Sequence, residues 1–304
     1  MQEGSRRAIF AALLANTGIA VAKFVGFLVT GAASLLAEAV HSVADSGNQG
    51  LLLLGGSRSR RRPTPDHPFG YGRERYFWAF VVSLVLFSLG GLFAIAEGIR
   101  KIREPHQLAS PAVAIAILVV AIVFDVVSLR TAIREADRER RGQRWLDFIR
   151  RAKSPELPVI LLEDVGATVG LVLALLGIAA AEVTGDPRWD AVGSLGIGVL
   201  LVVIAVALAV EMKSLLIGEA ARPADQTAIR DAIEAGADVR RLLHLRTLHL
   251  GPDELLVAAK LELEGTLSFE GVAAAIDAAE ERLRASVPTA RVVYLEPGRG
   301  GVLA

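Results

Sequence analysis

The sequence contains no cysteine among its 304 residues, and this absence excludes disulfide bonds, zinc–thiolate sites and thiol redox chemistry. Methionine is scarce as well: only Met1 and Met212 carry a thioether, so a Cu(I) pathway would lack its soft ligands. The formal net charge is zero, and the chain as a whole therefore suggests no nucleic-acid partner. What the sequence does contain is apolar residues, which make up 53% of the chain and raise the mean hydropathy to +0.47.

The apolar residues collect in six runs before about position 212, and each run approaches the ~20 residues that a helix needs to cross a bilayer. The first run continues past Lys23 to Val29 without a convincing small-residue cleavage site, so we expect a retained spanning helix rather than a signal peptide. These runs predict a multi-pass α-helical membrane protein with six transmembrane helices. The predicted helices cover Ala8 to Val29, a stretch within Ala32 to Gly56, Tyr76 to Ile99, a segment that follows Pro111 and continues to Arg140, Leu157 to Ala181, and Ala191 to Val210.

Arginine concentrates in the loops that follow the second and fourth predicted helices, whereas the other three connections are short and nearly balanced in charge. Because loops rich in Lys and Arg stay in the cytoplasm, we expect both loops and both chain termini on the cytoplasmic side. The predicted location is the cell inner (plasma) membrane, where these arginines set the topology and contact the headgroups of the lipid bilayer. They are Arg58, Arg60, Arg61, Arg62, Arg73 and Arg75 in one loop, and Arg134, Arg138, Arg140, Arg141, Arg144, Arg150 and Arg151 in the other.

The pattern changes from about Gly218 onward to that of a soluble domain. Helix, strand, strand, helix and strand follow one another, an order that fits a small α+β (αββαβ) sandwich with its helices on one face of the sheet. We therefore divide the chain into a membrane domain at residues 1–217 and a cytoplasmic domain at residues 218–304. The predicted elements of the second domain are a helix from Pro223 to Ala235, strands from His244 to Leu250 and from Leu255 to Leu263, a helix that Ser268 caps and that ends near Ala285, and a strand from Arg291 to Leu295.

The second predicted transmembrane helix carries four polar residues spaced 3, 4 and 3 apart, which places them on one narrow stripe. A carboxylate near the bilayer centre costs about 2.5–3.5 kcal/mol, so two in one span need a reason. One interpretation is a buried hydrogen-bonded network that joins helices. The other is a divalent-metal site, because His41 and Asp45, one turn apart, can point a nitrogen and an oxygen at the same ion. The four residues are Glu38, His41, Asp45 and Asn48.

Six spans, the motif His41-x-x-x-Asp45, an acidic pair in the fifth helix and an αββαβ domain together resemble the cation diffusion facilitator family. The resemblance covers essentially the whole chain and is sharpest at residues 37–49 and 67–74. Residues 161–164 are similar to the zinc transporter nine branch of that family. The resemblance implies a transporter rather than an enzyme, without a resident cofactor. It also implies an obligate homodimer, joined through the cytoplasmic domain, that exports Zn²⁺ or a similar divalent ion in exchange for protons.

Members of this family usually hold the ion with four ligands, one pair a helical turn apart on each of the second and fifth helices. His41 and Asp45 match the first pair, and Asp164 matches the second acid of the other pair. The position one turn before Asp164 is Ile160, whose side chain cannot bind a metal. The resemblance therefore implies the ligands His41, Asp45 and Asp164 and leaves the fourth position undecided.

Several candidates for the fourth ligand stay open. Glu163 lies roughly 100° around the helix from Asp164, so its side chain could swing in as a substitute. A water or another helix could fill the position instead, and Asn48, one turn beyond Asp45, offers a neutral oxygen. Glu163 could equally be the partner of Lys23 or a buried polar contact of another helix.

Relatives also bind metal in the loop before the third helix and in the soluble domain, but this sequence lacks some of the ligand residues at both places. In the loop before the third helix His67 remains, but Tyr71 stands at the second histidine position, and we interpret this loop as structural. In the soluble domain the aligned strand positions hold Lys260 and Tyr294, so a metal-bridged domain is not expected. Apolar pairing of the two cytoplasmic domains would then carry dimerisation.

The sequence favours a proton-coupled exporter of a divalent cation, and Zn²⁺ comes first because an imidazole nitrogen with carboxylate oxygens suits a small borderline ion. Metal-binding groups must be deprotonated, so protons and metal compete for His41 and its carboxylates, which is the physical basis for exchange. Transport of Mn²⁺, Fe²⁺ or Co²⁺ by the same mechanism stays open, as does a non-transporting membrane metal sensor or scaffold. An intramembrane metal hydrolase is disfavoured, because the sequence has no His-Glu-x-x-His-type motif.

Overall fold

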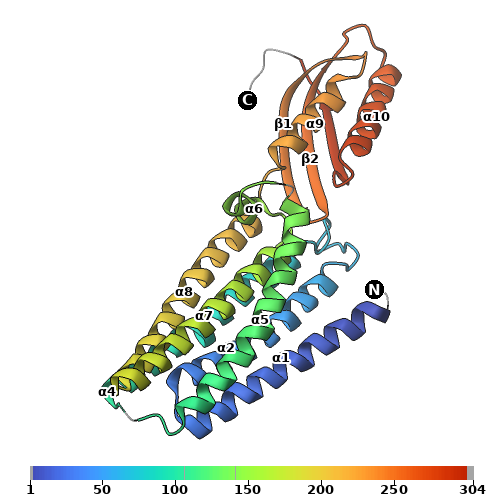
Figure 1. The fold of residues 1–304 in the computed structure, drawn as a ribbon. Helices are drawn as coiled ribbons and strands as arrows, with labels where there is room; N and C mark the ends of the chain where they lie inside the picture. The colour runs from blue at the N-terminus through green and yellow to red at the C-terminus, as the bar shows by residue number, and fades with distance from the viewer. Residues whose placement is uncertain (1–2, 106, 141, 300–304) are drawn as a thin grey trace. The chain divides into compact units, whose positions relative to one another are not determined.

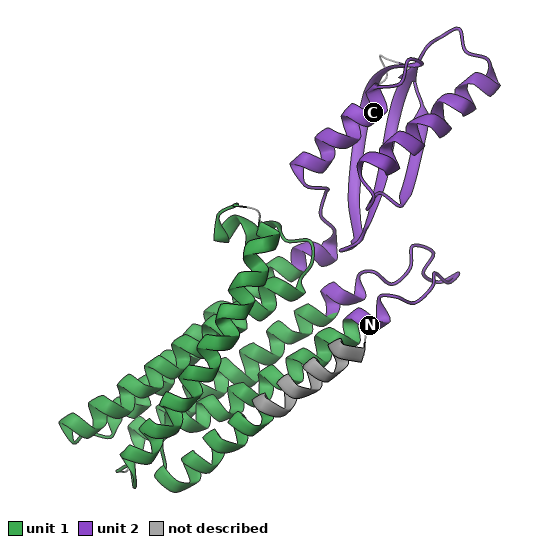
Figure 2. Ribbon diagram, turned by 45° about the vertical axis from the view of Figure 1, so that its right-hand side comes forward, with its two compact units in different colours: residues 1–55, 78–212 green, residues 56–77, 213–304 purple. Residues whose placement is uncertain are grey.

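The computed structural model describes residues 3–105, 107–140 and 142–299, with side chains from Thr17 onward in the first helix. The chain forms two compact units, which are coloured separately in Figure 2. The first comprises Met1–Gly55 and Trp78–Met212, and its described elements are all helical. The second comprises Gly56–Phe77 and Lys213–Ala304 and contains the sheet. It is discontinuous in sequence, because the loop between two membrane helices belongs to it.

The described residues form six helical segments of membrane length, which confirm the predicted fold class (Figure 1). The last four have both the length and the apolar composition of a membrane span. Within α1 the stretch Thr17–Thr30 is a shorter apolar helix, and α2, with 26 residues, is long enough to span but carries the polar stripe. The segments are α1 (Glu3–Thr30), α2 (Ala33–Arg58), the joined run of α3 (Glu74–Val85), η1 (Leu86–Leu92) and α4 (Phe93–Arg103), α5 (Pro111–Arg140), α7 (Glu156–Thr184) and α8 (Arg188–Ile217); a short α6 (Trp145–Arg151) lies between α5 and α7.

Most of these helices are longer than the apolar runs that predicted them. The last span, predicted from Ala191 to Val210, runs from Arg188 to Ile217, and the third, predicted from Tyr76 to Ile99, runs from Glu74 to Arg103. Apolar composition marks only the part of a helix that lies in hydrocarbon, whereas backbone hydrogen bonding continues into turns with charged side chains. The predicted continuation of the fourth span to Arg140 is confirmed by α5.

Close packing accompanies the π-helical segment η1, which interrupts the third span in its middle. A Cβ added at Gly91 of η1 would lie 2.6 Å from Val202 Cγ2, and one at Gly198 of α8 would lie 2.8 Å from the backbone nitrogen of Ile95. Neither position has room for a side chain, so the two helices approach each other through their backbones. Single π-helical turns inside longer helices often occur at functional sites, and this one lies beside the polar stripe of α2.

The second unit confirms the predicted αββαβ order with α9 (Pro223–Glu234), β1 (Val239–Gly251), β2 (Glu254–Leu263), α10 (Phe269–Ser286) and β3 (Val292–Pro297). The strand order is β1-β2-β3, antiparallel between β1 and β2 and parallel between β2 and β3. Every second residue of β2 is buried, and this buried face shares one core with residues of both helices. Both helices therefore cover the same face of the sheet. The core includes Ile229, Ile233, Leu255, Val257, Leu261, Leu283 and Val293.

Strand β1 begins at Val239, five residues before the predicted start at His244. The prediction missed the first five residues of the strand because two consecutive arginines interrupt the alternation of apolar and polar residues. Arg240 lies 3.2 Å from Glu264, and Arg241 lies 2.6 Å from a carboxylate oxygen of Glu262 on β2. Oppositely charged pairs across neighbouring strands stabilise a sheet without contributing any apolar pattern to the sequence.

The loop of the second unit, residues 56–77, has internal contacts and packs on the β1–β2 hairpin. A bridge joins Thr64 and His67, and the His67 ring stacks on Tyr71 at a centroid distance of 4.6 Å. A Cβ added at Gly72 would lie 2.7 Å from the carbonyl oxygen of Leu250, so the loop backbone lies directly against the hairpin. These contacts are those expected of a structural loop, and that interpretation of His67 and Tyr71 stays a prediction.

Candidate metal centre

The four polar residues of α2 share its buried face. Glu38 and Asn48 are fully buried, His41 is 1% exposed, and the side chain of Asp45 is 18% exposed. Val43, on the other side of the helix, is 61% exposed, as expected for a lipid-facing residue. The predicted stripe is therefore confirmed as an interior face of the helix.

His41 and Asp45 form a close pair that lacks hydrogen bonds. His41 Nδ1 and Asp45 Oδ1 are 3.4 Å apart, in an arrangement that does not meet hydrogen-bond geometry. Both ring nitrogens of His41, Oδ1 of Asp45 and Oδ1 of Asn48 are buried and have no hydrogen-bond partner among the residues that the structure describes. Buried polar atoms in proteins are nearly always satisfied. An imidazole and a carboxylate left with free electron pairs are suited to binding a cation.

The π-helical segment passes beside the His41 ring. A Cβ added at Gly90 of η1 would lie 3.9 Å from His41 Nδ1 and 3.1 Å from Leu201 Cδ1 on α8. Gly90 thus keeps the third span close to the imidazole without covering its nitrogen. The sequence shows a Gly90-Gly91 pair in the third span but not its place beside His41, because this contact joins residues far apart in the chain.

The two consecutive acids of α7 contact different helices. Glu163 is buried, and its Oε1 accepts a hydrogen bond of 2.6 Å from Asn48 Nδ2 on α2. Asp164 Oδ2 accepts a hydrogen bond of 3.1 Å from Ser128 Oγ on α5. Of the two acids, Glu163 is thus the one directly bonded to the stripe of α2.

The five predicted ligands do not converge on one point. They form the pair His41–Asp45 and the pair Asn48–Glu163, while Asp164 is bonded to α5. Within the described ranges, no group of three or more His, Asp or Glu side chains is close enough to hold one ion. The metal-binding role of each of the five stays a prediction.

Ile160, at the position where the family carries its fourth ligand, is part of an apolar cluster. It packs with residues of α5, α6 and α7, namely Ala132, Ala136, Phe148 and Leu161. Ile160 therefore takes part in hydrophobic packing between α5 and α7. Ser128, which sequence reasoning missed, lies three residues after Asp125 on α5, a spacing that puts both on one face and could have drawn attention to it.

Lys23 of α1 is paired with Glu38 and not with Glu163. Its Nζ lies 3.0 Å from Glu38 Oε2 and donates a hydrogen bond of 2.9 Å to Ser42 Oγ. The ion pair is almost completely buried. Of the structural interpretations of Glu163, its pairing with Lys23 is therefore wrong, whereas its contact with a polar residue of another helix is present.

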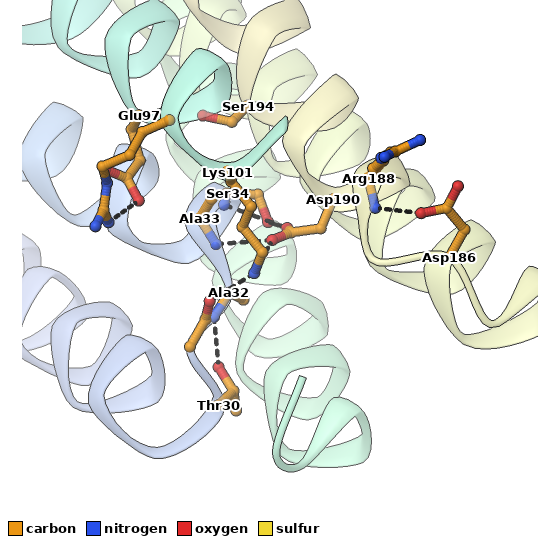
Figure 3. A network of polar contacts seen from close by, with 12 residues as sticks. Thr30, Ala32, Ala33, Ser34, Glu97, Lys101, Asp186, Arg188, Asp190 and Ser194 are labelled. Carbon is orange, nitrogen blue, oxygen red and sulfur yellow. Dashed lines mark hydrogen bonds and ion pairs between the residues drawn. The ribbon is translucent and has the colours of Figure 1, made fainter. Parts of the chain in front are cut away.

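A second polar network fixes the start of α2 (Figure 3). Asp190, fully buried in the first turn of α8, accepts hydrogen bonds from the backbone nitrogens of Ala33 at 2.7 Å and Ser34 at 3.3 Å, and from the Ser34 hydroxyl. Lys101 of α4 lies 3.0 Å from the same carboxylate and donates to the carbonyl oxygen of Gly31 at 2.7 Å. Asp190 thereby caps α2 from another helix and satisfies N–H groups that have no partner within α2.

Comparison with known proteins adds to this geometry. Residues 9–217 match the family model described as the cation efflux transmembrane domain. The mouse protein named proton-coupled zinc antiporter SLC30A9, mitochondrial, is 30% identical over 265 residues, which cover 86% of this chain and 47% of that protein. Metal tolerance protein C4 of Arabidopsis thaliana is 29% identical over 86% of this chain and 58% of its own length.

A bacterial relative matches over nearly its whole length. The cation-efflux pump FieF of Cronobacter sakazakii is 27% identical over 290 residues, which cover 94% of this chain and 90% of the pump. By contrast, the chain spans about half the length of the mammalian relatives it matches. The family model covers more than half of the chain and coincides with the helical unit that carries the polar stripe. This chain is therefore a multi-pass membrane protein that belongs to the cation efflux family of transporters.

Proposed function

We propose that this chain exports a divalent cation, in the first place Zn²⁺, in exchange for protons, with the ion bound in mid-membrane between α2 and α7. The observation that carries the proposal is the pair His41 and Asp45: His41 Nδ1 and Asp45 Oδ1 are buried, lie 3.4 Å apart and have no hydrogen-bond partner in the described chain. One imidazole with carboxylates suits Zn²⁺. The names of two relatives, a proton-coupled zinc antiporter and a cation-efflux pump, support the same function.

The proposed ligand set combines α2 and α7. His41 and Asp45 supply the first two ligands, Asp164 and Glu163 are the acids of α7, and Asn48 offers a neutral oxygen. The hydrogen bond between Asn48 and Glu163 supports a part for Glu163, because it already holds this carboxylate against α2. Glu163 and Asp164 are about 100° apart around α7, so the two carboxylates approach the stripe from different directions.

Proton exchange follows from competition for the same atoms. Imidazole and carboxylate groups bind metal only in their deprotonated forms, so each proton that binds weakens the site. An imidazole changes its protonation in the physiological range. On an acidic outer side protons displace the ion, and on the cytoplasmic side the ion displaces protons.

The orientation and assembly belong to the same proposal. The arginine-rich loops support cytoplasmic termini in a cell inner (plasma) membrane. Residues 218–304 would form the cytoplasmic domain through which two copies pair. Its sheet has one face covered by α9 and α10, which leaves the other face available to a second copy.

Proteoliposomes that contain the purified full chain and a metal-sensitive dye test this function. With the lumen more acidic than the medium, we expect Zn²⁺ uptake that stops when a protonophore and counter-ion carrier collapse the gradient. Mn²⁺, Fe²⁺ and Co²⁺, assayed in the same way, decide between the candidate ions. The control is Asp277→Asn, which removes an exposed carboxylate of α10 and should transport like wild type. Folded protein that moves none of these ions would contradict transport and favour a sensor or scaffold.

A further inference from the structure

Lys23 is a buried cation inside the membrane-spanning unit. Its side chain is 1% exposed, and its ammonium group binds Glu38 Oε2 at 3.0 Å and Ser42 Oγ at 2.9 Å. Ionisable residues within membrane helices are rare and usually mark a functional pathway. Neither Lys23 nor Glu38 belongs to the proposed ligand set, so this pair needs an explanation of its own.

Glu38 lies on the same face of α2 as the proposed ligands, three residues before His41 and seven before Asp45. Its second oxygen, Oε1, is buried and has no hydrogen-bond partner in the described part of the chain. A Cβ added at Gly170 of α7 would lie 2.5 Å from this oxygen, so the carboxylate reaches across to α7. Glu38 is thus a carboxylate with one free oxygen, next along the helix to an imidazole–carboxylate pair.

The donors around an ion decide which ion a site prefers. Imidazole suits Zn²⁺, whereas sites made of carboxylates and other oxygens suit Mn²⁺. With Glu38 added to His41 and Asp45, the site would gain a carboxylate and shift toward ions that prefer oxygen. The ammonium group of Lys23 opposes this shift, because it holds one oxygen of Glu38 and balances its charge.

We propose that Lys23 is a specificity-determining residue: it withholds Glu38 from the transported ion and so keeps the site selective for Zn²⁺ over Mn²⁺. This inference rests on the proposed function of the site at His41 and Asp45. Lys23 acts through Glu38 and does not contact the ion. Helix α1, which supplies none of the proposed ligands, thereby takes part in the choice of ion.

Binding of Zn²⁺ and Mn²⁺ to the purified full chain, measured by competition with a fluorescent chelator, tests the role of Lys23. In Lys23→Met we expect the affinity for Mn²⁺ relative to Zn²⁺ to rise about tenfold, the size of effect that residues next to metal ligands commonly have. Lys23→Arg keeps the cation and should keep the wild-type ratio. In the double variant Lys23→Met/Glu38→Gln the ratio should return to the wild-type value, because the released carboxylate is gone.

Further variants keep the test decisive if Lys23→Met fails to fold. Lys23→Gln removes the charge but keeps an N–H donor for Glu38, and it replaces Lys23→Met if that variant is not monodisperse. Glu38→Gln alone should leave the ratio unchanged, because Glu38 is already withheld in the wild type. An unchanged ratio in folded Lys23→Met or Lys23→Gln, a shift that persists in the double variant, or a shift in Glu38→Gln overturns the proposal. Wild-type protein that binds neither ion would instead overturn the proposed function.

Discussion

Two polar clusters lie inside the membrane-spanning unit, and they differ in how completely their hydrogen bonds are formed. At the start of α2, Asp190 and Lys101 are fully buried, and the Asp190 carboxylate binds two backbone N–H groups, the Ser34 hydroxyl and the Lys101 ammonium. Two turns further along the same helix, the His41 nitrogens and Asp45 Oδ1 are buried without such partners among the described residues.

The difference leads us to expect different roles for the two clusters. A buried charge without a partner destabilises the fold, so the cluster around Asp190 has the arrangement expected of a structural joint. A cluster that leaves its electron pairs free needs an explanation of its own, and a bound ion is one. We therefore expect substitutions at the first cluster to affect mainly stability and those at the second to affect mainly transport.

The largest expected effect is at the incomplete cluster. Asp45→Asn keeps the shape of the side chain but removes the charge that a divalent ion needs, and we expect Zn²⁺ flux in proteoliposomes to fall by about two orders of magnitude. Asp164→Asn should have a comparable effect if this acid also binds the ion. Thermal unfolding of both variants should resemble that of wild type, and near-normal flux in Asp45→Asn would rule out the proposed site.

The opposite pattern is expected at the complete cluster. Asp190→Asn leaves Lys101 as a buried cation without its counter-charge, which commonly costs about 3–5 kcal/mol. Thermal unfolding in detergent should show a clearly lower midpoint, while flux per folded molecule stays within a few-fold of wild type. The double variant Asp190→Asn/Lys101→Met should recover part of the loss. A stable Asp190→Asn protein with abolished flux would place this network in the transport pathway.

An effect of intermediate size is expected at Glu163, and measuring it decides whether this acid of α7 binds the ion as well as Asp164. Glu163→Gln keeps a polar group opposite Asn48 but removes one carboxylate, so a ligand role predicts a loss of Zn²⁺ affinity of about tenfold and a weaker dependence of binding on pH. The matched control is Glu182→Gln, an exposed glutamate on the same helix. Wild-type affinity in Glu163→Gln would leave His41, Asp45 and Asp164 as the ligands, completed by Asn48 or water.

The smallest effect is expected from a metal chelator on pairing through the soluble unit. Lys260, at an aligned ligand position, lies 3.1 Å from Glu296, and Tyr294 is exposed. We expect the mass of the full chain in detergent, measured by light scattering, to be that of a dimer with or without chelator. A dimer that dissociates when metal is removed would contradict apolar pairing.

The sequence could predict the spans and the polar stripe because both follow from local rules. A bilayer requires long apolar runs, and a helix places residues 38, 41, 45 and 48 on one face. The cap that Asp190 provides for α2 could not be predicted, because residues more than 150 positions apart leave no local pattern. The partner of Glu163 was undecidable for the same reason, since two consecutive acids look alike until the neighbouring helices are in place.

The discontinuity of the second unit bears on the order in which the protein is made. The loop 56–77 leaves the ribosome more than one hundred residues before the hairpin that Gly72 contacts. At about 5–20 residues per second, the loop waits on the order of ten seconds for this partner. During that interval the bridge between Thr64 and His67 and the stacking of His67 on Tyr71 can keep it folded on its own. The hairpin, once made, packs against the connection between α2 and α3, so truncation before the hairpin should leave that connection uncovered in an otherwise inserted chain.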